Sequence, residues 1–273
     1  MQPLDSQYLT THGYRTHFIE SGDGDPLILI HGGGAGADCR GNWAGSIPLF
    51  APSYRTIAYD MVGFGASDAP DPATFAYTQD ARTEQLLALI EALGYRKVNL
   101  IGNSMGGCTA LGVAMRRPDL LTNIVLMGSA GLSHSVTGAV SSILNYDFTM
   151  EGMRKVVSSL THADFTPSED MLRNRYELSV RPQTRASYAA TMGWIKQRGG
   201  LYYEESQIAR IKTRALIVNG KDDKVVPVQD AYRFLELLEN SSGSILSHCG
   251  HWAMIEHPTQ FAALTLQFLA GGQ

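Results

Sequence analysis

Short apolar runs alternate with longer amphipathic segments along most of the chain. Mainly apolar residues stand together at 27–30, 56–59, 98–101, 124–127 and 215–218. Runs of this length and continuity indicate strands that are covered on both faces, as in a parallel sheet. Residues 14–19 alternate in polarity instead, which is typical of an outer antiparallel strand. The pair at 245–246 marks a last, short strand-like segment.

Helical periodicity fills the intervals between these runs. From Asp80 onward, Leu86, Leu87, Ile90 and Leu93 recur at helical spacing, and the glycine that follows is a natural C-terminal cap. The same pattern predicts helices over 105–116, 228–238 and 259–269. Strands that alternate with helices predict a parallel sheet with helices on both faces.

The alternation stops between residues 133 and 208. That stretch has helical patterns at 149–160, 168–180 and 183–195, and no convincing buried strand. We predict a helical insertion of ~75 residues (133–208) between two parts of one core, 1–132 and 209–273. Open sheets bind ligands at the carboxyl ends of their strands. The insertion is therefore interpreted as a lid over a pocket; the alternative is that it simply covers the sheet.

Composition narrows the class of protein. The chain has 273 residues, of which 44% are hydrophobic and 18% charged, ordinary values for a globular protein. A net charge of −4 with scattered basic residues argues against a nucleic-acid partner. No apolar run approaches the ~18–20 residues that span a bilayer, and the N-terminal stretch lacks signal-peptide features. Three cysteines without a CxxC pair indicate a reduced, cytoplasmic compartment.

A candidate nucleophile stands at the end of the run at 98–101. Gly102-Asn103-Ser104-Met105-Gly106 matches G-x-S-x-G, placed between a predicted strand and a predicted helix. In this setting a strained turn exposes the serine hydroxyl, and small residues are needed on either side. The helix N-terminus favours a developing oxyanion. The alternatives are a glycine-rich phosphate loop or an ordinary tight turn.

A serine needs a base and a group that orients the base, and on this turn they follow as acid, then histidine. Asp222 and Asp223 come directly after the run at 215–218. We choose Asp223 as the acid with Asp222 as the alternative, because spacing does not separate them. His251, preceded by a glycine, follows the last strand-like segment. His248 and His257 are interpreted as surface or supporting residues.

Glycines after the first buried run complete the candidate site. His31-Gly32-Gly33-Gly34 lets backbone amides approach a ligand, and the amide of Met105 is the usual second donor to an oxyanion. No Lys-Ser/Thr pair follows the glycines, so a P-loop is excluded. The chain has no HExxH and no paired CxxC, and we predict no metal and no cofactor.

Together these motifs resemble the α/β-hydrolase family and, within it, the meta-cleavage product hydrolases, which break carbon–carbon bonds in aromatic degradation. The likeness to members from carbazole- and dibenzofuran-type pathways extends to GNW and LMGSAGL. The resemblance implies a mostly parallel eight-stranded sheet with helices on both faces and a helical lid. The stretches that carry it are LIHGGGAGA (29–37), GNW (41–43), GNSMGG (102–107), LMGSAGL (126–132), GKDD with VP (220–223, 226–227) and CGHWA (249–253).

The activity implied by this resemblance is hydrolysis of 2-hydroxy-6-oxo-hexa-2,4-dienoates, usually with an aryl group on the ketone. The products are a carboxylic acid and 2-hydroxypenta-2,4-dienoate. The dienolate is first protonated at carbon; Ser104 then attacks the C6 carbonyl or assists water, His251 shuttles protons, and Asp223 fixes its tautomer. Amides of Gly33, Gly34 and Met105 surround the oxyanion. Relatives need no cofactor and form dimers or larger even-numbered oligomers, so we expect a homodimer.

The resemblance also assigns the substrate pocket. A planar guanidinium grips both oxygens of a carboxylate, and Arg175 stands where the family keeps such an arginine; Arg173 nearby is interpreted as solvated. Departures from a biphenyl-pathway relative, with smaller residues in place of two phenylalanines and alanine in place of glycine, suggest a pocket for a bulkier ring. The remaining assigned residues are Asn42 and Asn103 at the oxygenated end, Trp252 as a pocket residue beside the histidine, and Leu160, Val225 and Ala130 at the departures.

Two other functions stay open at this point. A carboxylesterase or related acyl hydrolase uses the same three catalytic residues, and a receptor on this fold binds a ligand without turnover. Arg175 with the two asparagines favours the dienoate hydrolase, because an esterase needs no carboxylate clamp. A pure binder has no need of a base aligned to its serine.

Overall fold

The computed structural model describes residues 4–134 and 138–271. One sheet of eight strands runs through the molecule in the order β1-β2-β4-β3-β5-β6-β9-β10. β1 and β2 pair antiparallel, and β2 is antiparallel to β4; the other neighbours are parallel. This confirms the predicted sheet. The strands are β1 (Gln7–Thr11), β2 (Tyr14–Ser21), β3 (Pro26–Ile30), β4 (Arg55–Tyr59), β5 (Val98–Asn103), β6 (Leu121–Met127), β9 (Arg214–Gly220) and β10 (Ser241–Leu246).

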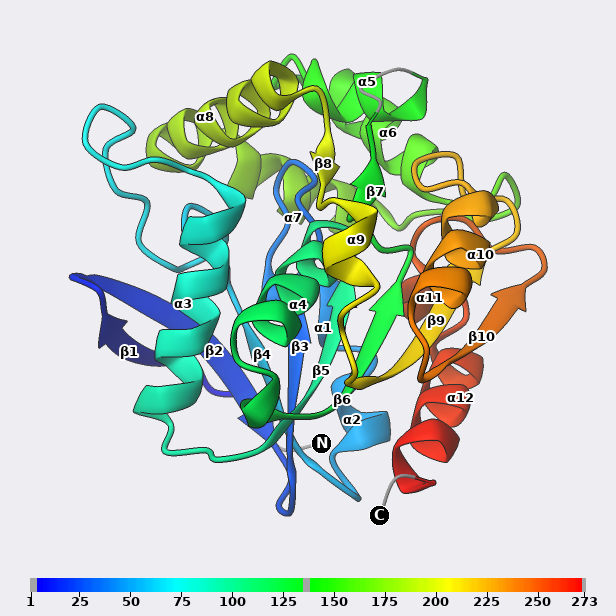
Figure 1. Cartoon of the computed structure of the whole chain (residues 1–273). Helices are drawn as coiled ribbons and strands as arrows, with labels where there is room; N and C mark the ends of the chain where they lie inside the picture. The colour runs from blue at the N-terminus through cyan, green and yellow to red at the C-terminus, as the bar shows by residue number, and fades with distance from the viewer. Residues whose placement is uncertain (1–3, 135–137, 272–273) are drawn as a thin grey trace.

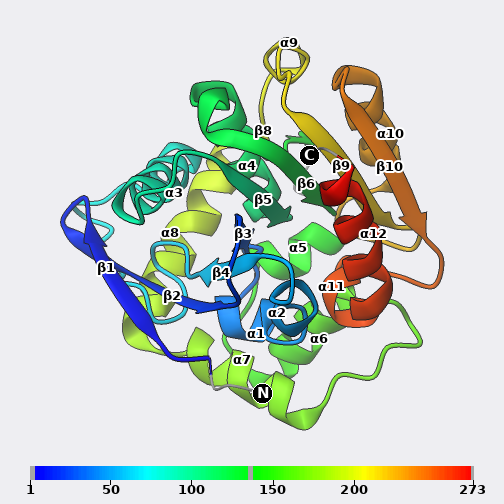
Figure 2. The same ribbon diagram turned by 90° about the horizontal axis from the view of Figure 1, so that it is seen from below.

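Helices cover the sheet on both faces, as the sequence predicted (Figure 2). One face carries α3 (Gln79–Ala92), α4 (Met105–Arg116) and α10 (Val228–Leu237), with α9 (Glu205–Ile208) against α4. The other face carries α1 (Cys39–Trp43), α2 (Ile47–Phe50), α11 (Ala253–Glu256) and α12 (Pro258–Ala270); a 3₁₀ turn, η1, spans Pro118–Leu120. Residues 27–30 of β3 are fully buried between these layers, as expected for a central parallel strand.

Among the described residues of the insertion, four helices that precede α9 lie above the carboxyl ends of the strands, at the top of Figure 1. They are α5 (Ala139–Leu144), α6 (Met150–Leu160), α7 (Glu169–Ser179) and α8 (Pro182–Arg198). Ser168 caps α7 by accepting a hydrogen bond from the amide of Met171 at 3.1 Å. We call α5–α8 with their connections the cap. The start of the predicted lid includes residues 135–137, which lie outside the described residues.

Some elements differ from the sequence prediction. A two-stranded antiparallel ladder, β7 (Leu132–Ser133) with β8 (Leu201–Tyr202), joins the two ends of the cap, where no strand was expected. Two-residue strands are too short to leave a periodic pattern. The short helix α5 and the first strand β1 were also missed. Within the described residues, no helix is long and apolar enough to cross a membrane.

Candidate active site

Ser104 lies on a strained turn between β5 and α4. Its backbone has φ 55° and ψ −118°, in the left-handed half of the map that non-glycine residues rarely occupy. The turn is tight: a Cβ on Gly102 would lie 2.4 Å from the carbonyl oxygen of Gly106, and one on Gly106 would lie 2.4 Å from that of Ile30. Both positions therefore require glycine. This geometry is the one that the G-x-S-x-G pattern predicts.

His251 and Asp223 form a buried pair beside this turn. Nδ1 of His251 lies 2.7 Å from Oδ2 of Asp223, and both side chains are almost completely shielded from solvent. The other carboxylate oxygen, Oδ1, accepts the backbone amides of Val225 and Val226 at 2.8 and 2.9 Å. These bonds fix the carboxylate, and an ionised acceptor keeps the proton of the imidazole on Nδ1.

Asp222, the alternative acid, points elsewhere. Its side chain is 44% exposed, and Oδ2 lies 3.7 Å from Nε2 of His162. His248 is exposed, and Nε2 of His257 donates a hydrogen bond to the carbonyl of His248 at 2.8 Å. Of the acids and histidines considered, the structure pairs Asp223 with His251.

Ser104 and His251 line one cavity between the sheet and the cap. Gly33, Gly34 and Met105 line it too, so the glycine loop and the first residue of α4 face the same space. His31 fixes that loop from behind: its Nε2 accepts the amide of Met61 at 3.0 Å, which leaves the proton on Nδ1 for the carbonyl of Gly32 at 2.7 Å. Burial lowers the pKa of His31 and keeps the ring neutral.

Three residues that line this cavity carry buried polar atoms without partners. Within the described part of the chain, Oδ1 of Asn42, Oδ1 of Asn103 and Nε of Arg175 are buried without a hydrogen-bond partner. All three residues line the cavity. Buried groups of this kind cost free energy unless a partner fills the gap. Their common position indicates that a polar group of a ligand satisfies them.

Arg175 brings a buried positive charge to the cavity. It is 5% exposed, its Nη2 donates to the carbonyl of Ala35 at 2.9 Å, and its guanidinium stacks on the ring of Trp252 at 4.8 Å from the centroid. Burial lowers the pKa of Arg175 to about 10, so the side chain stays charged at neutral pH. Arg173, on the same helix, is 62% exposed.

The rest of the cavity is apolar. Ala130, Leu160 and Val225, the three positions where the sequence departs from a relative, all line it. Cap helices α5 and α8 supply most of the remaining wall. Its apolar lining residues are Ala37, Ala130, Val140, Ile143, Leu144, Leu160, Met192, Ile195, Leu201, Val225 and Val226. The arrangement suits a ligand with one anionic end and one apolar end.

Known proteins share this arrangement. The model of the alpha/beta hydrolase fold matches residues 25–258. The 2-hydroxy-6-oxo-6-(2'-aminophenyl)hexa-2,4-dienoic acid hydrolase of Metapseudomonas resinovorans is 48% identical, over 97% of this chain and 90% of its own length. The crystal structure of a serine hydrolase involved in carbazole degradation superposes with a TM-score of 0.91 at 46% identity and covers 98% of this chain and 99% of its own.

A third similarity names the subfamily. The meta-cleavage product hydrolase of Pseudomonas fluorescens IP01 has a TM-score of 0.91 at 30% identity, over 98% of both chains. The chain belongs to the meta-cleavage product hydrolases of the α/β-hydrolase family. The resemblance drawn from the motifs is thereby confirmed.

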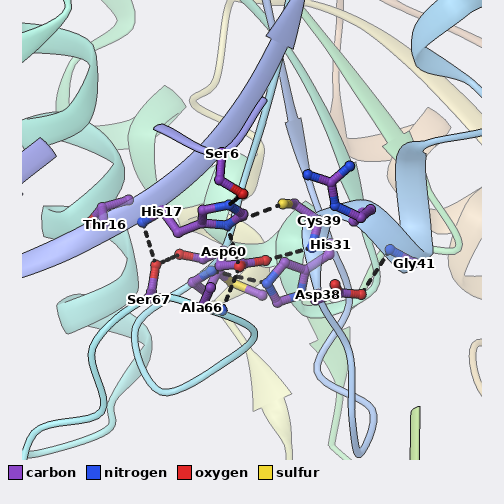
Figure 3. A network of polar contacts seen from close by, with 12 residues as sticks. Ser6, Thr16, His17, His31, Asp38, Cys39, Gly41, Asp60, Ala66 and Ser67 are labelled. Atoms are coloured by element: carbon purple, nitrogen blue, oxygen red, sulfur yellow. Dashed lines mark hydrogen bonds and ion pairs between the residues drawn. The ribbon is translucent and has the colours of Figure 1, made fainter. Parts of the chain in front are cut away.

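Sequence reasoning missed two carboxylates that hold the active-site loops of this α/β-hydrolase. The first is Asp60, at the centre of the network in Figure 3. Its Oδ1 accepts the amide of Cys39 at 2.6 Å, and its Oδ2 accepts the amide of Ala66 at 2.8 Å and faces Nδ1 of His17 at 2.7 Å. Asp60 thus ties the end of the glycine loop to β2 and to the loop after β4. A lone aspartate after a strand gave no sign of this in the sequence.

The second is Glu256, five residues after His251. Its carboxylate accepts the amides of Gly250 and Trp252 at 3.1 Å, and that of His162 at 2.7 Å. The amide of His251 itself donates to the carbonyl of Leu160 at 3.0 Å. The catalytic-histidine loop, defined here as residues 247–252, is therefore fastened to the segment that follows α6 of the cap.

Replacing Asp60 by Asn is expected to lower the free energy of unfolding by about 2–4 kcal/mol, because an amide cannot accept all three donors. Burial raises the pKa of Asp60, but the hydrogen bonds from His17, Ala66 and Cys39 hold it below its usual value. The contribution is therefore present above the unfolded pKa of about 3.9 and is lost as pH falls through the lower folded value. Urea unfolding against pH measures it.

Asp68→Asn is the matched control, since Asp68 lies in the same loop but forms a surface ion pair with Arg15. That pair contributes about 1 kcal/mol or less. Equal stability of Asp60→Asn and the unmodified hydrolase at neutral pH would contradict the role given to Asp60.

Proposed function

We propose that this hydrolase cleaves the C5–C6 bond of 2-hydroxy-6-oxo-6-aryl-hexa-2,4-dienoates, releasing an aromatic carboxylic acid and 2-hydroxypenta-2,4-dienoate. The observation that carries the proposal is a single cavity that joins Ser104 and His251 to a buried, incompletely paired arginine. A serine nucleophile with its base serves acyl transfer from many substrates and does not by itself select a dienoate. The arginine supplies the anion-binding end that a dienoate requires.

The first half of the reaction is ketonisation. The 2-hydroxyl of the dienol loses its proton and C5 gains one, which places a ketone at C2 and makes the C5–C6 bond ready to break. In this proposal Arg175 binds the C1 carboxylate, and the free oxygens of Asn42 and Asn103 accept hydrogen bonds at the oxygenated end. The ring of Trp252, over which the guanidinium lies, helps to position Arg175.

The second half is hydrolysis at C6. An oxygen nucleophile, Ser104 itself or a water that it assists, adds to the carbonyl while His251 takes the proton. Amides of Gly33, Gly34 and Met105 stabilise the oxyanion. Collapse breaks the C5–C6 bond, and the electron pair passes into the dienolate of the leaving group, which is then protonated. If a water added to C6, this step gives the carboxylic acid directly; if Ser104 added, a water then hydrolyses the ester on Ser104 and releases the acid. Asp223 holds His251 in the tautomer that this transfer needs.

The apolar wall supports an uncharged group on the C6 ketone. Ala130 and Val225 of the core are small enough to admit a ring, and the lid proposed over 133–208 supplies Leu160 and the other apolar side chains of the wall. A second carboxylate at this end would be desolvated without a partner, which is costly. Aryl dienoates are thus the proposed class, ahead of dienedioates.

A carboxylesterase that uses the same three residues is the second candidate. Mixing the purified hydrolase with a yellow aryl dienoate and following the loss of visible absorbance tests the proposal directly. A p-nitrophenyl ester is assayed in parallel. A higher kcat/KM for the ester would reverse the ranking, and absence of turnover of both would favour a binding protein on this fold.

Arg175→Gln is expected to lower kcat/KM for the dienoate by about 100-fold, since a charge-assisted hydrogen-bonded pair contributes about 1.5–3 kcal/mol. The p-nitrophenyl ester, which has no carboxylate, should be little affected. Arg173→Gln, on the exposed side of the same helix, is the control and should leave both substrates unchanged. Equal losses for the ester and the dienoate would point to a structural role for Arg175.

We also propose that the enzyme is a cytoplasmic homodimer without cofactor or metal requirement, acting on a small-molecule substrate. Cys39, Cys108 and Cys249 are buried and unpaired, which suits a reducing compartment. Light scattering after size exclusion measures the mass and would refute the dimer if it gave a monomer.

A further inference from the structure

Two histidines and an aspartate meet on the surface where the cap touches the catalytic-histidine loop. His162 and Asp164 follow α6, and His248 lies between β10 and α11. The side-chain ligand atoms of these three residues all lie within 4.8 Å of one another. The imidazole centroids of His162 and His248 are 5.6 Å apart. None of the three belongs to the active-site cavity described above.

Imidazole nitrogens with a carboxylate are the ligands that zinc takes in proteins, at about 2.0–2.2 Å. Nδ1 of His162 lies 3.5 Å from Oδ2 of Asp164, and Nε2 of the same ring lies 3.7 Å from Oδ2 of Asp222, a further carboxylate at the rim. Asp164 is 82% exposed, and His248 is exposed as well. Small rotations of these two exposed side chains bring their donors to ligand distance from the ring of His162, which is 16% exposed.

We propose that His162, Asp164 and His248 form a surface site for zinc or a similar borderline divalent ion. We further propose that the ion fastens the cap to the catalytic-histidine loop. We refer to these three residues as the cap–loop site. The site does not suit calcium or magnesium, because these ions require more oxygen donors than a single carboxylate provides.

A second group, His17, Cys39 and Asp60, also has its ligand atoms within 4.8 Å, but it does not suit a metal. Figure 3 shows that the carboxylate of Asp60 is already surrounded by donors. Both of its oxygens accept backbone amides, and one faces His17. An ion there would have to displace these buried hydrogen bonds. The cap–loop site has fewer bonds to displace: Asp164 and His248 are exposed, and the hydrogen bond that Nδ1 of His162 accepts from the amide of Asp164 at 3.1 Å leaves Nε2 of that ring to bind an ion.

The cap–loop site adjoins the catalytic histidine through the backbone. His162 shares the carboxylate of Glu256 with Gly250 and Trp252, the two neighbours of His251. The segment around His162 also packs closely on the loop: a Cβ on Gly250 would lie 2.6 Å from the amide nitrogen of His162. An ion that joins His162 to His248 therefore cross-links the two segments that flank His251. We expect the hydrolase to become more stable and to turn over more slowly.

The test uses the untagged hydrolase with its full chain. Zinc chloride is titrated by calorimetry and in thermal unfolding, and dienoate turnover is followed with and without zinc. We expect one zinc per chain, a rise in Tm that grows with zinc concentration, and a several-fold fall in kcat that EDTA reverses. The turnover arm rests on the proposed function, whereas the two binding arms do not. If the protein did not turn over the dienoate at all, zinc binding could still be measured.

Variants locate the ion. His248→Asn and His162→Gln are each expected to weaken zinc binding at least about tenfold, as loss of even a supporting residue at a metal site costs 10–100-fold. His248 has φ 52°, which asparagine tolerates. His12→Asn is the matched control, because His12 is also exposed and also has φ 52°. Zinc binding that survives both variants would overturn the site, and binding that leaves kcat unchanged would overturn its coupling to His251.

Discussion

Ser104→Ala is expected to lower kcat for the aryl dienoate by at least about 10⁴-fold while substrate binding remains measurable. Removal of the nucleophile of a serine triad has effects of this size, because the remaining base and oxyanion donors have no oxygen to act on. The pocket itself loses one oxygen atom. Alanine takes over the backbone angles of Ser104 at the same strain, since neither residue branches at Cβ.

Stopped-flow absorbance measures both parts of this prediction, because the bound dienoate is coloured. Ser158→Ala, an exposed serine of α6, is the control and should leave turnover unchanged. If a Ser104→Ala variant retained more than about a tenth of the activity, Ser104 would not be the catalytic nucleophile. The proposed mechanism would then be wrong.

Asp223→Asn should lower kcat by about 10³–10⁴-fold with little change in the fold. Oδ1 of Asp223 accepts two amides, so in the variant the amide oxygen takes that place and the NH₂ group faces Nδ1 of His251. The imidazole then carries its proton on Nε2 and cannot accept one from Ser104. Steady-state kinetics on the dienoate measure the loss.

The matched control lies one residue earlier. Asp222→Asn removes a carboxylate of the same strand end that is 44% exposed and faces His162. It should leave kcat within about twofold of the unmodified enzyme. If Asp222→Asn and Asp223→Asn lost activity equally, the buried pair would not be the one that orients His251.

The strands and helices of the core were largely readable from the sequence because burial on both faces leaves an apolar run. Residues 27–30 and 124–127 lie in β3 and β6, and helix α4 begins at Met105 and ends at Arg116, as predicted. β10 behaves differently: its first four residues are Ser, Ser, Gly and Ser, and the strand lies at the edge of the sheet. An edge strand half exposed to solvent has no need of apolar residues, so only its last two residues were noticed.

The motifs named candidate residues far apart along the chain, and the structure brings Ser104, His251 and the glycine loop to one cavity. The choice between Asp222 and Asp223 was made without a physical argument. It is settled in space by the amides of Val225 and Val226, which hold one carboxylate inward. Asp60 and Glu256 were missed because each accepts hydrogen bonds from backbone amides of other segments. Nearly every residue type has a backbone amide, so the sequence does not show which amides become partners.

The sequence by itself determined the parallel sheet, the strained serine turn and the order of nucleophile, acid and base, because these depend on local periodicity and on glycines that neighbours require. Tertiary structure alone decided which carboxylate meets His251. It also decided which arginine of the cap loses its solvent, and where the cap meets the catalytic-histidine loop. These are contacts between distant segments. Their free energy depends on burial and on the orientation of donors, which arise only when the cap packs over the sheet.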